Sequence, residues 1–343
     1  MPHALEFGLD TFGDVTAAPD GTPKTHAQVI RDLVEEAVLA DRLGVDFIGV
    51  GEHHRADFAV SAPEVVLGAI AARTTRIRLG SAVTVLSSDD PVRVYQRFAT
   101  VDAVSGGRAE VILGRGSFTE SFPLFGLPLE KYELLFEDRL DLFARLLPQE
   151  PVTWQGRTRA PLDGQRIFPL VENPPLRTWI GVGGSPQSVI RAARYGLPLM
   201  LAIIGGEPAR FAPYADLYRQ ACGQLGIAVP PIGVHSPGHV AETDEAAREA
   251  MWPAYRVMRD RIGAERGWPP MDRAEFDREV ETGSLYVGSP ETVARRIAAT
   301  IRVLGIQRFQ LKYSAGALSH DHLMGCIGLY ATRVIPLVRE MLG

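Results

Sequence analysis

The chain of 343 residues has little of several features that mark particular classes of protein. Its only cysteines, Cys222 and Cys326, lie far apart in helical patterns, and we expect both to be reduced, packed thiols. No apolar stretch approaches about 18 residues, so no membrane span is predicted. The first residues lack a basic segment followed by an apolar one, which argues against a signal peptide. These absences predict a cytoplasmic protein.

The chain also has no large excess of charge of either sign. The net charge is −5, only three of the 36 basic residues are lysine, and the arginines do not cluster along the sequence. This balance argues against nucleic acid or an anionic membrane as a partner. An apolar content of 46% and a charged content of 22% are typical of a globular protein.

Apolar, β-branched runs alternate with longer helical patterns, which is typical of βαβ units and a parallel sheet. The sequence predicts an α/β fold, a (β/α)8 TIM barrel in which residues 1–343 form a single domain. Even strand spacing favours the barrel over an open doubly wound sheet. Two Pro- and Gly-rich or irregular insertions, at about 150–175 and 267–285, interrupt the rhythm. The predicted strands are 6–11, 46–51, 77–86, 109–114, 178–182, 198–204, 231–236 and 308–313.

Barrel enzymes carry their sites at the carboxyl ends of strands, and the second predicted strand ends in Glu52-His53-His54. Adjacent strand residues face opposite sides, so His53 and His54 cannot both bind one metal without a bulge. The His-x-His spacing of metal-binding barrels is missing. We therefore expect no metal, and assign proton transfer or hydrogen bonding to one histidine. His235 and His239, after the seventh strand, either approach the site or lie in a solvent-facing loop.

The fifth strand runs into Gly183-Gly184-Ser185, followed by a helix that contains Ser188. Residues without side chains let a ligand approach the backbone, and first-turn N–H groups with two serine hydroxyls can hold a phosphate. The alternative is an ordinary helix cap with a tight turn. We favour phosphate, because Gly-Gly-Ser exceeds what a cap requires.

Arg115 stands between two glycines at the end of the fourth strand. Its guanidinium can pair with a phosphate or lie against a ring system. The alternative is a salt bridge on the barrel rim, with Glu120 as the candidate partner. Considered with the Gly-Gly-Ser turn, a phosphate-bearing cofactor is the simpler account.

Several short segments occur together in a recognisable order and spacing. They are Glu52-His53-His54, 80–86, 90–93, 105–108, Gly114-Arg115-Gly116, 122–126, Gly183-Gly184-Ser185 and 195–198. In combination they resemble the bacterial luciferase-like monooxygenase family of flavin-dependent oxidoreductases, and the resemblance covers most of the chain.

The resemblance implies a barrel that binds FMN, or reduced FMN as a co-substrate, at its carboxyl rim. It places the catalytic histidine at His53 and a non-proline cis peptide between Ala82 and Val83, against the flavin ring and next to Thr84. It also implies a monooxygenase that uses O₂ to oxidise a small organic molecule bound between the two insertions, a separate NAD(P)H:flavin reductase as partner, and a homodimer. The implied phosphate site comprises Arg115, Gly183, Gly184, Ser185 and Ser188.

This sequence departs from the family pattern at two positions. Gly114 stands where the luciferase α chain has a cysteine near the reactive flavin carbon, which we expect to widen the pocket. A second family arginine has no counterpart on the helix after the fourth strand, where Glu133 lies instead, so we expect weaker phosphate binding. Two alternatives stay open: an F420-dependent enzyme that transfers hydride without oxygen, and a non-catalytic flavin-binding barrel. Retention of both histidines argues against the second.

Overall fold

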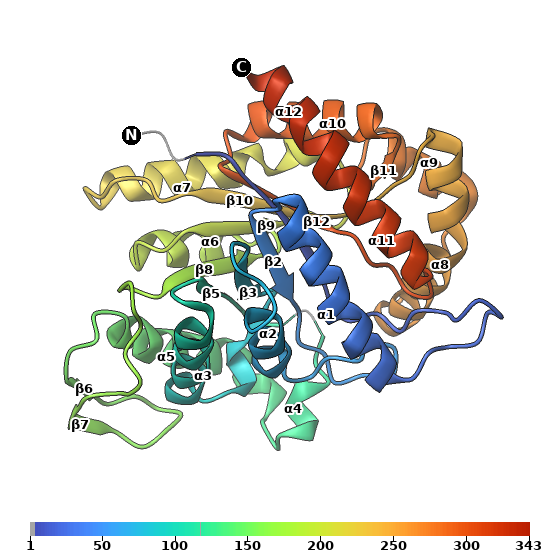
Figure 1. The fold of residues 1–343 in the computed structure, drawn as a ribbon. Helices are drawn as coiled ribbons and strands as arrows, with labels where there is room; N and C mark the ends of the chain where they lie inside the picture. Colours follow the sequence, from blue (N-terminus) through green and yellow to red (C-terminus); the bar gives the residue numbers. More distant parts are fainter. Residues whose placement is uncertain (1–3, 117) are drawn as a thin grey trace.

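Eight parallel strands close into a barrel at the centre of the molecule (Figure 1). The structure is a computed structural model that describes residues 4–116 and 118–343. The ring closes because β12 pairs with β1 and β9 pairs with β10. This confirms the TIM barrel and excludes the open sheet. In ring order the strands are β1 (Glu6–Thr11), β2 (Phe47–Val50), β3 (Arg78–Ser81), β5 (Ala109–Gly114), β8 (Arg177–Val182), β9 (Leu199–Ala202), β10 (Ile232–Val240) and β12 (Arg308–Lys312).

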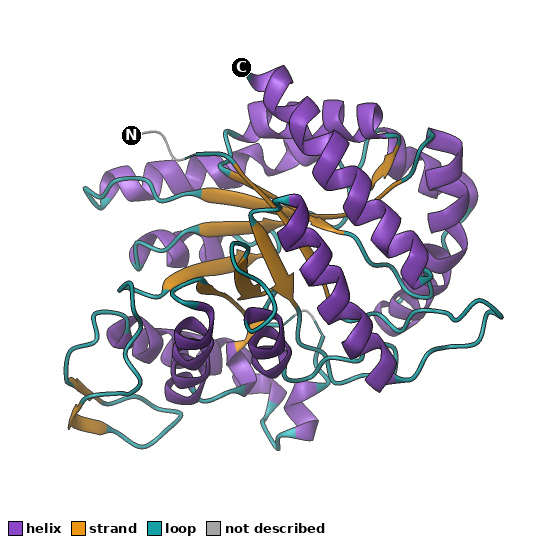
Figure 2. Cartoon of the chain, viewed as in Figure 1, coloured by secondary structure: helices purple, strands orange, loops and turns teal. Residues whose placement is uncertain are grey.

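Helices surround the strands on the outside of the barrel (Figure 2). Among the described residues, none of these helices is both long and apolar enough to cross a membrane. They are α1 (His26–Leu43), α2 (Pro63–Ala71), α3 (Pro91–Ser105), α4 (Ser121–Leu124), α5 (Tyr132–Leu146), α6 (Pro186–Arg194), α7 (Ala212–Gln224), α8 (Asp244–Arg266), α9 (Arg273–Glu281), α10 (Pro290–Leu304), α11 (His320–Leu329) and α12 (Ile335–Leu342).

Local signals in the sequence set where many helices begin and end. Asp90 caps α3 by accepting hydrogen bonds from the N–H groups of Val92 and Arg93 at 2.9 and 3.2 Å. Ser289 caps α10 in the same way, as its position before Pro290 predicts. These caps fix the helix starts at the carboxyl rim, which is where the candidate site residues lie.

The structure differs from the predicted elements in four places. The third strand is interrupted at Ala82 and Val83, and resumes as β4 (Thr84–Val85) beside β5. Strand β10 continues to Val240 because its second half pairs with a short strand, β11 (Tyr286–Gly288). The insertion 267–285 is not irregular, since Asp272 caps α9 within it. The sequence pattern predicts one final helix from about His320 to Leu342, but a π-helical turn at Tyr330–Val334 divides it just before Pro336, which has no N–H to donate.

The other insertion, 150–175, forms a hairpin of β6 (Val152–Trp154) and β7 (Leu162–Gln165). Its contacts run along the outer helices: Trp154 Nε1 donates to Asp141 of α5 at 2.8 Å, and the Phe168 carbonyl accepts from Gln96 of α3 at 3.0 Å. Arg159, between the two strands, donates to Asp90 at the start of α3 at 2.8 Å. The expectation that this insertion lines the substrate site stays a prediction.

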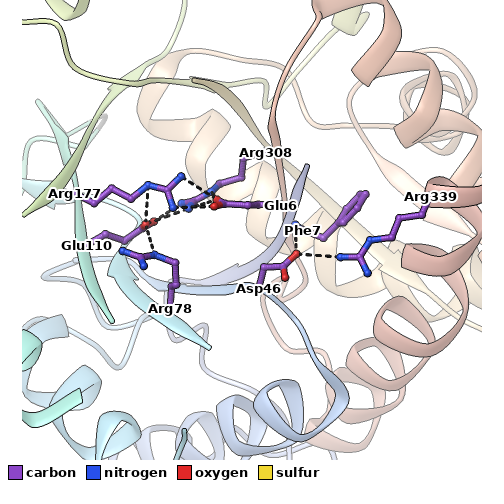
Figure 3. A network of polar contacts seen from close by, with 8 residues as sticks. All are labelled: Glu6, Phe7, Asp46, Arg78, Glu110, Arg177, Arg308 and Arg339. Carbon is purple, nitrogen blue, oxygen red and sulfur yellow. Dashed lines mark hydrogen bonds and ion pairs between the residues drawn. The ribbon is translucent and has the colours of Figure 1, made fainter. Parts of the chain in front are cut away.

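The amino end of the barrel is filled by a buried network of charges (Figure 3). Arg308 is fully buried, and donates to Glu6 Oε2 at 2.7 Å through Nε and to Glu110 Oε2 at 3.1 Å through Nη2. Arg177 donates to both oxygens of Glu6, and Arg78 donates to Glu110 at 3.2 Å. Burial alone raises the pKa of Glu110, but the charges and hydrogen bonds of the arginines lower it to about 2.

Large side chains fill the lumen above this network, opposite glycines that make room for them. Phe47, Ile112, Trp179 and Met200 form one buried cluster. A Cβ on Gly80 would lie 2.7 Å from the Phe47 ring, so only glycine fits beside it. The lower barrel is thus packed, and the carboxyl mouth is left as the place for a site.

Replacing Glu110 by glutamine should lower the free energy of unfolding by about 3–5 kcal/mol at neutral pH, because Arg308 would lose a buried counter-charge. Urea unfolding followed by circular dichroism measures this. Since the folded pKa of Glu110 is depressed, its contribution is complete above about pH 4.5 and is lost as pH falls towards 2. The difference between wild type and variant should shrink over that window.

The matched control is Glu35→Gln, which removes the same charge from a pair with Arg73 whose side chains are 52% and 46% exposed. This change should leave the free energy of unfolding close to the wild-type value, because water and salt screen an exposed pair. Equal effects of the two substitutions would contradict a special role for the buried network.

Candidate active site

His53 lies in the loop that follows β2, within a wall of three phenylalanine rings. Phe58 stacks on the imidazole at 4.4 Å between ring centroids, while Phe12 and Phe118 meet it edge-on at 5.0 and 4.9 Å. Such apolar rings exclude water from one side of the imidazole while leaving the rim open. The surroundings suit a proton-transfer group that works beside an organic ligand.

Glu120 fixes the orientation of the His53 ring. Its Oε1 lies 3.1 Å from His53 Nδ1, whereas its Oε2 is buried and has no partner among the described residues. Burial by itself raises the pKa of Glu120, but the hydrogen bond with His53 and the imidazole charge bring it below its ordinary value. With Nδ1 held by a carboxylate, Nε2 is the nitrogen left for a ligand.

His54 has a different partner, as expected for neighbouring residues that face opposite ways. Its Nε2 lies 3.0 Å from Glu52 Oε1, and the other oxygen of Glu52 accepts a hydrogen bond from the Val85 N–H at 2.9 Å. The hydrogen bond and charge of Glu52 raise the pKa of His54, although burial opposes this. Glu52 therefore links the end of β2 to β4. His54 contacts the same carboxylate and so belongs to this link.

A second carboxylate–histidine pair stands in the mouth of the barrel, between β1 and β10. His235 Nδ1 lies 2.8 Å from Asp10 Oδ2, and Asp10 is fully buried with Oδ1 unpartnered among the described residues. Phe12 stacks on His235 at 6.0 Å and meets His53 on its other side. The sequence left open whether His235 approaches the site, and it did not indicate Asp10 as its partner.

His239 also lies on β10 and is 1% exposed, so neither histidine belongs to a solvent-facing loop. Burial and the nearby His322 lower the pKa of His239 to about 4. No three His, Cys, Asp or Glu side chains in residues 4–116 and 118–343 are grouped as metal ligands. Cys222 and Cys326 are free and buried, as predicted.

The peptide bond between Ala82 and Val83 is cis, as the resemblance implies. Val83 packs against the lumen cluster, and a Cβ on Gly114 would lie 2.5 Å from Val83 Cγ2. The expectation that Gly114 widens the pocket is therefore wrong, because the Val83 side chain occupies that space. Thr84, next in the chain, is buried with its hydroxyl unpartnered among the described residues.

The Gly-Gly-Ser turn lies at the start of α6. Gly184 has φ +111°, a conformation that favours glycine, and a Cβ on Gly183 would meet open space. Ser185 caps the helix by accepting from the Ser188 N–H at 3.3 Å, so the cap considered from the sequence is present. The open backbone beside it still leaves room for an anion.

Arg115 pairs with Glu133 and not with Glu120, which corrects the expected rim salt bridge. Glu120 is unavailable because it holds His53. Glu133 also lies 3.3 Å from Arg191, which donates to the Ser188 hydroxyl at 3.3 Å. Sequence reasoning missed Arg191; its place one helical turn after Ser188 was the available signal.

These residues fit a phosphate-bearing ring cofactor. Arg115 is about a quarter exposed and is linked through Glu133 and Arg191 to Ser188, in the first turn of the helix that follows the open Gly183 backbone. Buried oxygens of Asp10, Glu120 and Thr84 have no partner among the described residues, and such groups need a hydrogen-bonding partner. Near the second insertion, Glu265 at the end of α8 accepts two hydrogen bonds from Arg55, in the loop after β2, at 2.6 and 2.7 Å.

A family model described as luciferase-like monooxygenase matches residues 6–308. Among curated proteins, an N-acetyl-S-alkylcysteine monooxygenase of Bacillus subtilis is 31% identical over 234 residues, which cover 66% of this chain and 65% of the relative. A limonene 1,2-monooxygenase of Rhodococcus erythropolis is 28% identical, covering 71% and 64%.

Solved structures of similar fold include monooxygenase RslO1 from Streptomyces bottropensis, with a TM-score of 0.84, 24% identity and coverage of 97% of this chain and 99% of that one. The oxygenating constituent of a Pseudomonas putida 3,6-diketocamphane monooxygenase, in complex with FMN, gives a TM-score of 0.76 at 18% identity, covering 97% and 98%. An F420-dependent secondary alcohol dehydrogenase gives 0.74 at 18% identity, covering 98% and 99%.

Substituting Gly114→Ala should lower the free energy of unfolding by about 1–3 kcal/mol, because the added methyl group overlaps Val83. Adding Val83→Ala should recover part of this loss, since the overlap disappears. Gly183→Ala is the control, because its Cβ meets nothing within 4 Å. Chemical denaturation of wild type, Gly114→Ala, Val83→Ala, the double variant and Gly183→Ala tests the point. Additive effects of the Gly114 and Val83 changes would contradict their contact.

Substituting Glu52→Gln should lower the pKa of His54 towards its ordinary value, because the carboxylate partner is lost. An NMR titration of the imidazole C–H resonance, assigned with His54→Gln, measures this. A raised folded pKa means that the pair's stabilisation is complete below about pH 6.5 and is lost as pH rises through the folded value. An unchanged titration in Glu52→Gln would show that Glu52 does not set the pKa.

Proposed function

Because the chain belongs to the luciferase-like monooxygenase family, we propose that it is an FMN-dependent monooxygenase. It would use reduced flavin and O₂ to oxidise a small organic molecule. The family match, the barrel and the monooxygenase names of the curated relatives support this reading. The observation that carries it is the placing of His53, held by Glu120 within a phenylalanine wall at the carboxyl rim.

His53 is the proposed proton-transfer residue. The Glu120 carboxylate holds Nδ1, so Nε2 can hold or move a proton at a ligand in the mouth. Phe12, Phe58 and Phe118 keep water from that side of the ring. His54, braced by Glu52, supports the loop that carries His53.

The cofactor would lie across the mouth, with its ring beside Ala82, Val83 and Thr84. When bound, reduced FMN supplies two electrons and the reactivity towards O₂ that no side chain has. Arg115 and the Gly183, Gly184, Ser185 turn, with Ser188 behind it, would hold the phosphate. The FMN complex of a protein with this fold supports the choice of cofactor.

F420 is the second candidate cofactor, because two F420-dependent enzymes share the fold with TM-scores of 0.73 and 0.74. Such an enzyme would transfer hydride to or from its substrate without O₂. We further propose a single-domain cytoplasmic homodimer that receives reduced flavin from a separate NAD(P)H:flavin reductase. The phenylalanine wall suits a small apolar substrate.

A fluorescence titration with FMN, reduced FMN and F420 tests the proposal directly. Arg115→Ala should raise the FMN dissociation constant about tenfold or more, the worth of a charge-assisted contact, while leaving riboflavin binding unchanged. Riboflavin is the matched control because it lacks only the phosphate. Binding of F420 alone would move the protein to hydride transfer. An unchanged FMN constant would remove Arg115 from the phosphate site.

A further inference from the structure

The carboxylate of Glu133 bridges two arginines that come from different parts of the barrel. Arg115 follows β5, Arg191 lies on α6, and both reach Glu133 near the start of α5. Arg191 also contacts the Ser188 hydroxyl, in the first turn of the helix that Ser185 caps. An anion thus already sits between two guanidinium groups, at the corner where a cofactor phosphate is expected.

The three charged groups differ in how firmly they are held. Arg191 is 7% exposed, its Nε donates to Glu137 at 2.7 Å, and its guanidinium lies over the Phe136 ring at 5.3 Å. Glu133 is 58% exposed and has only the two arginines as its ion-pair partners among the described residues. Arg191 is therefore held in place without Glu133, and Arg115 keeps the Tyr132 ring at 5.4 Å. The Glu133 side chain can turn out into solvent at little cost.

The net charge of this cluster determines whether a phosphate is attracted to it. Arg115 and Arg191 carry two positive charges, and Glu133 and Glu137 carry two negative ones, so the corner is neutral. A phosphate that entered beside Glu133 would face a neutral cluster with a carboxylate at its centre. If Glu133 turns away, the same phosphate faces a net positive pair of guanidinium groups.

We propose that Glu133 is an internal counter-ion that competes with the phosphate of the flavin for Arg115 and Arg191. This inference rests on the proposed function and adds two points to it. Arg191 on α6 supplies the second cation that the helix after β5 lacks, and Glu133 sets a weak affinity for phosphate-bearing ligands. A flavin held in this way exchanges readily, which suits a reduced cofactor delivered from elsewhere.

The test compares FMN with riboflavin in wild type, Glu133→Gln and Glu130→Gln. Removing the competing charge should tighten FMN binding about tenfold, the size expected for one charge-assisted contact, and leave riboflavin unchanged. Glu130→Gln makes the same charge change three residues away, on an exposed side chain that pairs with neither arginine, and should alter neither constant. In an Arg115→Ala background the gain from Glu133→Gln should fall, because one of the two cations is absent.

Three results would overturn the inference. FMN affinity in Glu133→Gln could stay at the wild-type value, both flavins could tighten equally, or Glu130→Gln could match Glu133→Gln through bulk charge alone. If wild type binds neither flavin, the proposed function fails.

Inorganic phosphate then tests the corner by itself. Phosphate should raise the melting temperature more than chloride does at equal ionic strength, and this difference should be larger in Glu133→Gln than in wild type. Equal rises would refute the inference.

Discussion

The buried charge network at the amino end of the barrel is the interaction on which the rest of the structure depends. Arg308 is fully buried on β12, and joins Glu6 on β1 to Glu110 on β5 across the lumen. Its guanidinium also lies 4.6 and 4.4 Å from the rings of Phe47 and Trp179. Charges and rings together close this end, so a ligand can enter only from the carboxyl mouth, and the site is confined to one rim.

The candidate site residues lie on two sides of the carboxyl rim. On the β1, β2 and β10 side, two carboxylate–histidine pairs flank Phe12, which places two imidazoles against apolar rings. On the β5 and β8 side lie the arginines and the open glycine turn of the proposed phosphate site. Between them Val83 fills the space above the lumen cluster that Gly114 leaves. A flat, phosphate-bearing ligand would span both sides, which is the shape that the proposed cofactor has.

Arginine–glutamate pairs at the two ends of this barrel differ in how easily they can separate. At the floor, Glu110 and Arg308 are fully buried, and separating them would leave a charge in a medium that cannot solvate it. At the mouth, water can solvate Glu133 if it leaves Arg115 and Arg191. The first pairing is structural, whereas the second is the one that we propose a ligand phosphate displaces. Exposure, not residue type, makes the difference.

The sequence by itself determined the alternation of strands and helices, the helix caps such as Asp90 and Ser289, and the strand ends that carry His53 and His54. These follow from patterns within about 30 residues, because hydrophobic period and capping are local properties. The resemblance added the family and the cis bond at Ala82 and Val83. It also placed Arg115 beside the Gly-Gly-Ser turn.

Only the tertiary structure decided which groups meet. Glu120 holds His53 from 67 residues away, Asp10 pairs with His235 across 225 residues, and Arg191 reaches Glu133 across 58. Each pairing depends on the register between the strands and on which strands close the barrel. Neither feature can be read from the periodicity of the sequence. The same holds for Val83 and Gly114, whose contact arises because β4 and β5 lie side by side. Local patterns specified the parts of the site, and closure of the barrel brought them together.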